Sequence, residues 1–165
     1  MTKNFNTNTS NEQEWLTPKY ITDNLGVFDL DPCSPADRRP WDTAKHHIGL
    51  PEDGLQAKWY GRVWCNPPYG RETFKWLSKL AEHGSGIALI FARTETIGFH
   101  TQIWGKAKGI FFFKGRLSFC YVDGTKGNTA NAPSCLVSYS LEDNEYIKKA
   151  GFSGKFVELK GLINE

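Results

Sequence analysis

Short apolar runs, bounded by Gly, Pro or polar residues, recur along the chain and predict the strands of one sheet. Two of them, 86–92 and 109–113, are apolar at nearly every position, which is typical of parallel strands that are covered on both faces. We interpret as strands residues 27–34, 62–65, 86–92, 109–113, 117–122 and 134–139, with an edge strand at 155–159.

Apolar residues at helical spacing lie between several of these runs. Residues 72–83 carry such a stripe, and Gly84 ends the helix that it predicts. Thr17 suits an N-cap and Pro18 a first helical residue, so a helix should run from Pro18 to about Leu25. Further helices are expected after an N-cap at Thr94, toward Gly105, and over 142–150.

Strands that alternate with helices indicate an α/β fold. About thirty residues separate the runs 27–34 and 62–65, which is too few for two full βαβ units. Pro35 and Pro40 also argue against a long helix in this interval. We therefore expect a compact, trimmed Rossmann-like sheet that is mostly parallel and has antiparallel C-terminal strands.

Two polar stretches refine this picture. Residues 1–12 are rich in Asn and Thr and nearly free of large apolar residues, so we expect a disordered arm before a single domain over 13–165. Residues 123–133 are rich in Gly, Thr and Asn, and they predict a long mobile loop.

Composition and charge add mainly exclusions. The 165 residues carry a net charge of +2, which neither requires nor excludes nucleic acid. The four Cys lack metal-binding spacing, and His46 and His47 have no ligand partner nearby, so we predict no metal and a surface position for both His. Because no signal peptide or membrane-length apolar run appears, we expect a soluble protein of the cytoplasm.

The main candidate for chemistry is the corner at residues 63–70. An apolar run ends at Asn66, and Pro67 and Pro68 force the chain out of the sheet before Tyr69. Open α/β sheets bind ligands at the carboxyl ends of their strands, where this corner should lie. A plain turn is the simpler interpretation of the same residues.

Such a corner suits the methylation of an exocyclic amine, whose lone pair is delocalised into its ring. The Asn66 side-chain oxygen and the Pro67 carbonyl would accept the two amine hydrogens and localise the lone pair on nitrogen. Tyr69 would stack on the base. Catalysis of this kind depends on orientation and preorganised hydrogen bonds rather than on a metal or a strong base.

The sequence Asn66-Pro67-Pro68-Tyr69 resembles the Asn-Pro-Pro-Tyr motif of amino-group methyltransferases that use S-adenosylmethionine. Together with 61–70 and Asp53-Gly54-Leu55, it makes the chain similar to the phage DNA N6-adenine methyltransferases, the phage Dam family, over about residues 14–140. The resemblance implies a class I methyltransferase sheet, S-adenosylmethionine as cofactor, and double-stranded DNA as partner of a monomer or homodimer. For a phage or prophage protein, the compartment would be the host cytoplasm.

The resemblance also implies a cofactor site. Asp31-Pro32-Cys33-Ser34 resembles the first motif of this group, which lines the cofactor, although no Gly-x-Gly follows it here. Thr17-Pro18 resembles the Thr-Pro that helps to hold the methionine carboxylate, with a plain helix cap as the alternative. Asp53 would lie near the cofactor adenine. The residues expected around the cofactor are Trp15, Thr17, Pro18, Asp29, Asp31, Pro32, Cys33, Asp53 and Asn66.

Five further residues are candidates for contacts with DNA. Arg93 follows a buried strand, and Arg116 lies in a Gly-Arg-Leu-x-Phe sequence that recurs in the phage Dam family. Lys126, Asn128 and Asn131 lie in the Gly-rich stretch, and Asn side chains suit the edges of adenine. Ordinary surface positions beside turns are the simpler interpretation.

We therefore expect site-specific methylation of adenine N6 in duplex DNA after base flipping, with a GATC-like site implied by the resemblance. Two alternatives stay open. One is the same chemistry on an RNA base or a protein glutamine, and the other is a non-catalytic nucleic-acid-binding module.

Overall fold

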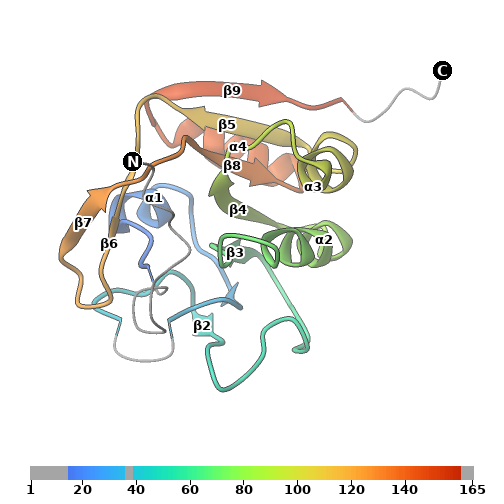
Figure 1. The fold of residues 1–165 in the computed structure, drawn as a ribbon. Helices are drawn as coiled ribbons and strands as arrows, with labels where there is room; N and C mark the ends of the chain where they lie inside the picture. The colour runs from blue at the N-terminus through green and yellow to red at the C-terminus, as the bar shows by residue number, and fades with distance from the viewer. Residues whose placement is uncertain (1–14, 36–38, 161–165) are drawn as a thin grey trace.

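The computed structural model describes residues 15–35 and 39–160, so the arm expected over 1–12 lies outside the described residues. Seven strands of the described part form one sheet in the order β2-β1-β3-β4-β8-β5-β9 (Figure 1). Their bounds are β1 Leu30–Asp31, β2 His46–His47, β3 Val63–Cys65, β4 Gly86–Phe91, β5 Gly109–Phe113, β8 Ser134–Ser138 and β9 Gly154–Glu158.

The parallel strands of this sheet place their carboxyl ends at one edge. β2, β1, β3 and β4 pair in parallel, whereas β8 runs antiparallel to β4 and β5, and β9 runs antiparallel to β5. Five of the seven strands therefore point the same way. This confirms a Rossmann-like, mostly parallel sheet with antiparallel C-terminal strands. The first strand is shorter than predicted, because only Leu30–Asp31 of the run 27–34 is paired.

Helices cover both faces of the sheet (Figure 1). α2 and the segment α3–η1 pack on the face that carries Val63 and Cys65, while α1 and α4 pack on the face that carries Trp64. Alternate residues of β3 point to opposite faces, so all three are buried. The helices are α1 Lys19–Asp23, α2 Thr73–His83, α3 Ile97–Phe99 followed by the π-helical turn η1 His100–Trp104, and α4 Leu141–Lys149. In the described part of the chain, no helix is both long and apolar enough to cross a membrane.

Two predicted helix caps are wrong. Pro18 occupies the N-cap position of α1, and no side chain caps that helix, so Thr17 is left for other contacts. Thr96, not Thr94, caps α3, because its hydroxyl accepts a hydrogen bond from the Phe99 backbone N–H at 3.3 Å.

The segment 123–133 is also not the structureless loop that its composition predicts. Lys126–Thr129 forms β7, which pairs with β6, Ser118–Cys120, in a separate two-stranded hairpin. Gly and Asn favour turns, so the composition of this segment predicted a loop where the structure has a strand.

The hairpin is tied to the segment that precedes α1. The Leu16 backbone N–H donates to the Cys120 carbonyl at 2.8 Å, and the Cys120 N–H donates to the Leu16 carbonyl at 3.1 Å. The ring of Trp15 lies 5.1 Å from that of Tyr121 and also covers Gly127. Residues 15–17 therefore form a short connection between the hairpin and the main sheet.

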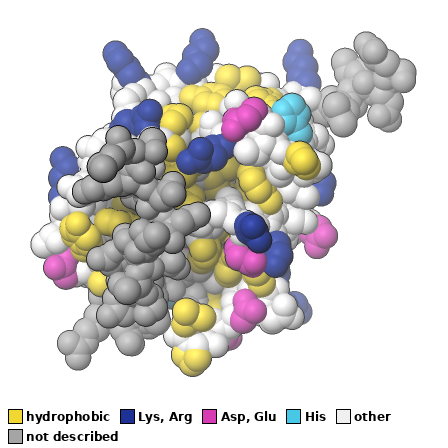
Figure 2. Space-filling model, in the orientation of Figure 1, with side chains coloured by type: hydrophobic (Ala, Val, Ile, Leu, Met, Phe, Trp, Pro, Cys, Tyr) yellow, Lys and Arg dark blue, Asp and Glu magenta, His cyan; other side chains and the backbone are white. Residues whose placement is uncertain are grey.

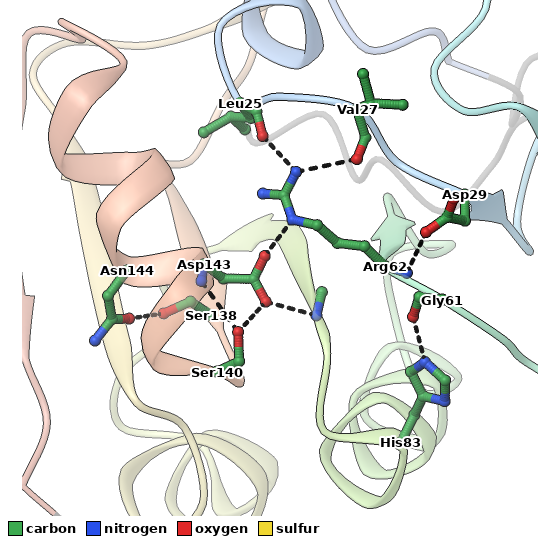
Figure 3. Close-up of polar contacts among 11 residues, drawn as sticks. Leu25, Val27, Asp29, Gly61, Arg62, His83, Ser138, Ser140, Asp143 and Asn144 are labelled. Carbon is green, nitrogen blue, oxygen red and sulfur yellow. Dashed lines mark hydrogen bonds and ion pairs between the residues drawn. The ribbon is translucent and has the colours of Figure 1, made fainter.

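A buried ion pair ties α4 to the start of β3 and to the segment before β1 (Figure 3). The Arg62 Nε donates to the Asp143 carboxylate at 2.6 Å, and its Nη1 donates to the carbonyls of Leu25 at 2.6 Å and Val27 at 3.3 Å. Only 9% of the Arg62 side chain and none of the Asp143 side chain is exposed. Residues distant in the sequence are thus held around one guanidinium.

Other groups complete this network. The guanidinium carbon lies 4.2 Å from the centre of the Phe28 ring and 3.9 Å from that of Tyr146. The second Asp143 oxygen accepts hydrogen bonds from the Gly86 N–H at 2.8 Å and the Ser140 hydroxyl at 2.6 Å. Asp143 therefore also fixes the first residue of β4, the strand beside β3.

We predict that Arg62→Ala lowers the free energy of unfolding by about 3–5 kcal/mol, because it leaves the Asp143 charge buried without its partner. Urea denaturation followed by circular dichroism would measure the loss. Lys75→Ala is a matched control, since Lys75 pairs with Glu72 on the exposed side of α2 and should cost about 1 kcal/mol or less. Equal losses in the two variants would contradict the role assigned to Arg62.

Candidate active site

The corner after β3 is fixed at both ends. Trp64 and Cys65 are fully buried below it, and Pro67 is buried while Pro68 is exposed. On the far side, the Thr73 hydroxyl donates to the Pro68 carbonyl at 2.6 Å, which ties the corner to the first residue of α2. Because each proline restricts the residue before it, the corner has little freedom to change shape.

Three side chains set the position of the Asn66 amide. Its Nδ2 donates to the Thr17 hydroxyl oxygen at 3.1 Å, and the Tyr69 hydroxyl donates to its Oδ1 at 3.4 Å. The indole Nε1 of Trp64 donates to the same Thr17 oxygen at 3.3 Å. A carbonyl oxygen has two lone pairs, so Oδ1 can still accept a hydrogen from a ligand.

Tyr69 lies in an aromatic group. Its ring stacks on that of Phe91, with centres 4.1 Å apart and an angle of 10° between the planes. Phe119 of β6 meets it nearly at right angles, at 6.1 Å. Burial raises the pKa of the Tyr69 phenol well above its ordinary value, so the hydroxyl stays a neutral hydrogen-bond donor at any physiological pH.

A cleft beside Asn66 gathers five of the nine residues expected around the cofactor. These are Trp15, Thr17, Asp31, Cys33 and Asn66. They come from the segment before α1, from the end of β1 and from the end of β3, so the edge shared by the parallel strands brings them together. Leu16, Ser34, Pro35, Arg39 and Thr43 also line this cleft.

Asp31 is the acidic group of the cleft. Only 3% of the residue is exposed, and its two oxygens accept hydrogen bonds from the Thr43 hydroxyl and from the Cys33 N–H, the latter at 3.1 Å. Burial raises the pKa of this carboxyl from 3.8 to about 6 despite these bonds. A carboxylate held in this way favours a cationic ligand.

Arg39 is the basic group of the cleft. Its Nη1 donates to the Ser34 hydroxyl at 3.3 Å, but the buried Nε has no hydrogen-bond partner among the described residues. A carboxylate oxygen of Asp42 forms an ion pair with that nitrogen at 3.7 Å. An acid, a guanidinium with spare donor capacity and the Thr17 hydroxyl match the ammonium and carboxylate of an amino acid in chemistry, as in the methionine part of S-adenosylmethionine. The volume of the cleft is only about 10 Å³, room for about one water molecule, so its walls would have to move apart to admit such a group.

Four of the expected cofactor residues lie outside this cleft. Asp29 accepts a hydrogen bond from the Arg62 backbone N–H at 2.8 Å and pairs with Lys45, so it serves the fold. Asp53 is exposed and accepts from the Leu55 N–H at 2.9 Å, as a turn residue does. The Pro32 carbonyl packs closely against Gly54, which places the turn at Asp53 beside β1. Pro18 lines a second cavity.

This second cavity, of about 530 Å³, lies between the start of α1 and the hairpin β6–β7. Arg116 and Lys126, two of the expected DNA contacts, line it together with Lys19, Tyr20 and Trp41. Its remaining lining residues are Pro18, Leu117, Ser118, Cys120 and Gly124, so no carboxylate is among the lining residues.

The other expected DNA contacts lie elsewhere on the surface. Arg93 is exposed just after β4, and Asn131 is exposed shortly before β8, at the end where these two strands pair. Asn128 is exposed on β7.

Sequence reasoning missed Thr43 and Arg39 and misplaced His47. The His47 side chain is 7% exposed, and its Nε2 accepts hydrogen bonds from the backbone N–H groups of Thr43 and Ala44, so it is structural rather than superficial. Thr43 meets Asp31 across twelve residues of chain, which no local pattern signals. His46 is exposed, as expected.

Within 15–35 and 39–160, no group of three or more His, Cys, Asp or Glu side chains could hold a metal ion.

Comparison with known proteins gives one result. The model of a family described as DNA N-6-adenine-methyltransferase (Dam) matches residues 4–149. No curated protein and no solved structure matches the chain.

The pKa of Asp31 generates a prediction about stability. Because the folded pKa of about 6 lies above the ordinary 3.8, the stability that protonated Asp31 contributes is complete below about pH 4 and is lost as pH rises through 6. Without ligand, Asp31→Asn should therefore raise the free energy of unfolding at pH 8 by up to about 3 kcal/mol relative to wild type, and by little at pH 4.5. Urea denaturation at both values would measure this difference.

Glu52→Gln serves as the control, because Glu52 is an exposed carboxyl. A gain for Asp31→Asn that is the same at both pH values would contradict the raised pKa.

Proposed function

The chain belongs to the DNA N-6-adenine-methyltransferase (Dam) family, whose members are DNA N6-adenine methyltransferases, and on that premise we propose a site-specific reaction on duplex DNA. The N6 amine of one adenine would receive a methyl group, with S-adenosylmethionine as donor and a GATC-like sequence as the first site to test. The observation that carries this proposal is the hydrogen-bonded Asn66 amide at the end of β3. It lies beside a cleft that contains the Asp31 carboxyl and the Arg39 guanidinium.

The corner would orient the amine. The Asn66 oxygen has a lone pair to spare beside the Tyr69 hydroxyl, and the Pro67 carbonyl lies outside the sheet ladder, so two acceptors are available for the two N6 hydrogens. Acceptance of both hydrogens concentrates the nitrogen lone pair on the side away from them. Bound S-adenosylmethionine would supply a methyl group from its sulfonium, with the neutral thioether as the leaving group, and the methylated N6 would release one proton to solvent. The residues of the chain then act by orientation and by fixed hydrogen bonds.

The cleft residues would hold the cofactor through its amino acid end. Asp31 suits the ammonium group, and the Arg39 Nε and Thr17 hydroxyl suit the carboxylate. Trp15 and Cys33 would pack against the same end, while the turn at Asp53 lies beside Pro32 and is the candidate for the adenine end.

The target adenine would have to leave the duplex, because N6 is otherwise engaged in a base pair inside the stack. Phe91 and Phe119 contact the Tyr69 ring, and together the three rings would form an aromatic lining for the base. Stacking against such rings is worth about 1–3 kcal/mol per base.

DNA would lie along the hairpin. Lys19, Arg116 and Lys126 line one cavity whose lining residues include no carboxylate. The Lys19 ammonium is paired with Asp23 at 2.5 Å, so Arg116 and Lys126 are the side chains that would supply positive charge for phosphates. Figure 2 shows Lys and Arg side chains spread over the visible face and its margin. Arg93, Asn128 and Asn131 are exposed and are the further candidates for DNA contacts.

We predict that Asn66→Ala lowers turnover by about 100- to 1,000-fold, because one of the two acceptors for the amine is lost. The dissociation constant for S-adenosylmethionine, measured by calorimetry, should change little. The assay is transfer of labelled methyl groups to mixed DNA, with the modified base then mapped. Near-normal turnover would contradict the role of Asn66.

The same assay decides among substrates. Wild-type transfer to RNA or to a peptide, but not to DNA, would favour methylation of another amine. An absence of S-adenosylmethionine binding by the wild type would favour a non-catalytic binding module.

We predict that Arg116→Ala and Lys126→Ala each weaken binding to duplex DNA at all sequences and reduce the slope of log affinity against log salt concentration by about 1. Fluorescence anisotropy at several salt concentrations would measure both quantities. Lys106→Ala is the matched control, because Lys106 is exposed just before β5, whereas the hairpin follows the other end of that strand. Equal slopes for the hairpin variants and this control would place the DNA elsewhere.

A further inference from the structure

The Thr17 hydroxyl is a shared acceptor at the centre of the site. Only 3% of the residue is exposed, and its oxygen receives hydrogen bonds from the Trp64 indole and the Asn66 amide. A hydroxyl has two lone pairs and one hydrogen. With both lone pairs in use, its hydrogen is the only group left for a ligand, and Thr17 lines the cleft that also contains Asp31 and Arg39.

The two donors to Thr17 differ in kind. The Trp64 indole nitrogen carries a hydrogen and can only donate, so one lone pair of the hydroxyl is committed. The Asn66 amide has a donor end and an acceptor end, and both ends could bond to a hydroxyl. If the Thr17 hydrogen pointed at Asn66, the amide could turn its oxygen inward and present its NH₂ group to the substrate, where it could not accept a hydrogen from an amine.

An anion in the cleft removes this ambiguity. When a carboxylate accepts the Thr17 hydrogen, the hydroxyl can only accept from Asn66. The amide must then direct its Nδ2 inward and its Oδ1 outward, beside the Tyr69 hydroxyl. We propose that Thr17 is a positioning residue that couples occupation of the cofactor cleft to the orientation of the Asn66 amide. The inference rests on the proposed function, because the anion is the carboxylate of the cofactor.

The first test uses the wild-type protein and S-adenosylhomocysteine, which carries the same amino acid end and has no methyl group to transfer. Heteronuclear NMR would follow the side-chain NH₂ resonances of Asn66, assigned by their loss in Asn66→Ala, and the indole N–H resonance of Trp64. We expect both to shift and the Asn66 pair to sharpen as the ligand saturates. Binding without any change at Asn66 would overturn the coupling, whereas an absence of binding would overturn the proposed function itself.

A second test separates positioning from simple binding. Thr17→Val keeps the shape of the side chain but removes the acceptor and the donor, and Thr17→Ser keeps both. We expect Thr17→Val to lower kcat at saturating cofactor by about a hundredfold. We expect it to weaken S-adenosylhomocysteine binding by no more than about tenfold, as for one hydrogen bond.

Thr17→Ser should restore kcat to near the wild-type value. Thermal unfolding would confirm that both variants are folded, and if Thr17→Val is not, the NMR titration of the wild type still decides. A wild-type kcat for Thr17→Val, together with weakened binding, would show that Thr17 is only a ligand of the cofactor and would overturn the proposal.

Discussion

Arg62 carries a permanent positive charge into the interior, one residue before the strand that ends at Asn66. Its guanidinium is bonded to Asp143, to two carbonyls before β1 and to the faces of two rings. Desolvation of such a pair is costly, and its net contribution to stability can be small. Its geometric effect is larger, because α4, β4 and the start of β3 must all be in place before the charges are satisfied. Because β3 begins directly after Arg62 and ends before Asn66, this network also helps to fix the position of the corner.

The stiffness of the corner at residues 66–69 would allow hydrogen-bond acceptors to be placed with precision. Orientation of an amine needs acceptors held to within fractions of an ångström rather than strong acids or bases. Cys65, Pro67 and the bond from Thr73 to Pro68 hold the backbone, and Thr17 and Tyr69 hold the Asn66 side chain. The buried carboxyl of Asp31 is held less favourably, because burial raises its pKa and the ionised form therefore costs stability.

The sequence allowed the corner, most strands and the final helix to be predicted, because each is written in adjacent residues. The run before Asn66 could only be a buried strand, and two prolines after it could only end that strand. Arg39 and Thr43 could not be found in this way, since they join the cleft through contacts made across the fold. The helix cap predicted at Thr17 was wrong for a related reason: its local sequence is that of a cap, but Trp64 and Asn66 reach its hydroxyl across more than forty residues. The loop predicted over 123–133 was wrong because it rested on composition alone, and β7 forms there.

The pair of backbone hydrogen bonds between Leu16 and Cys120 has a mechanical consequence. Thr17 is the next residue along the chain, so a displacement of the hairpin is transmitted to it with no flexible joint between. If a molecule that docks on the hairpin shifts β6 and Thr17 with it, and the occupant of the cleft binds the two positions of Thr17 differently, the affinities of the two ligands depend on each other. Thermodynamic reciprocity then requires the occupant of the cleft to feel the docked molecule by the same factor. Loading of the two sites would be a single cooperative process.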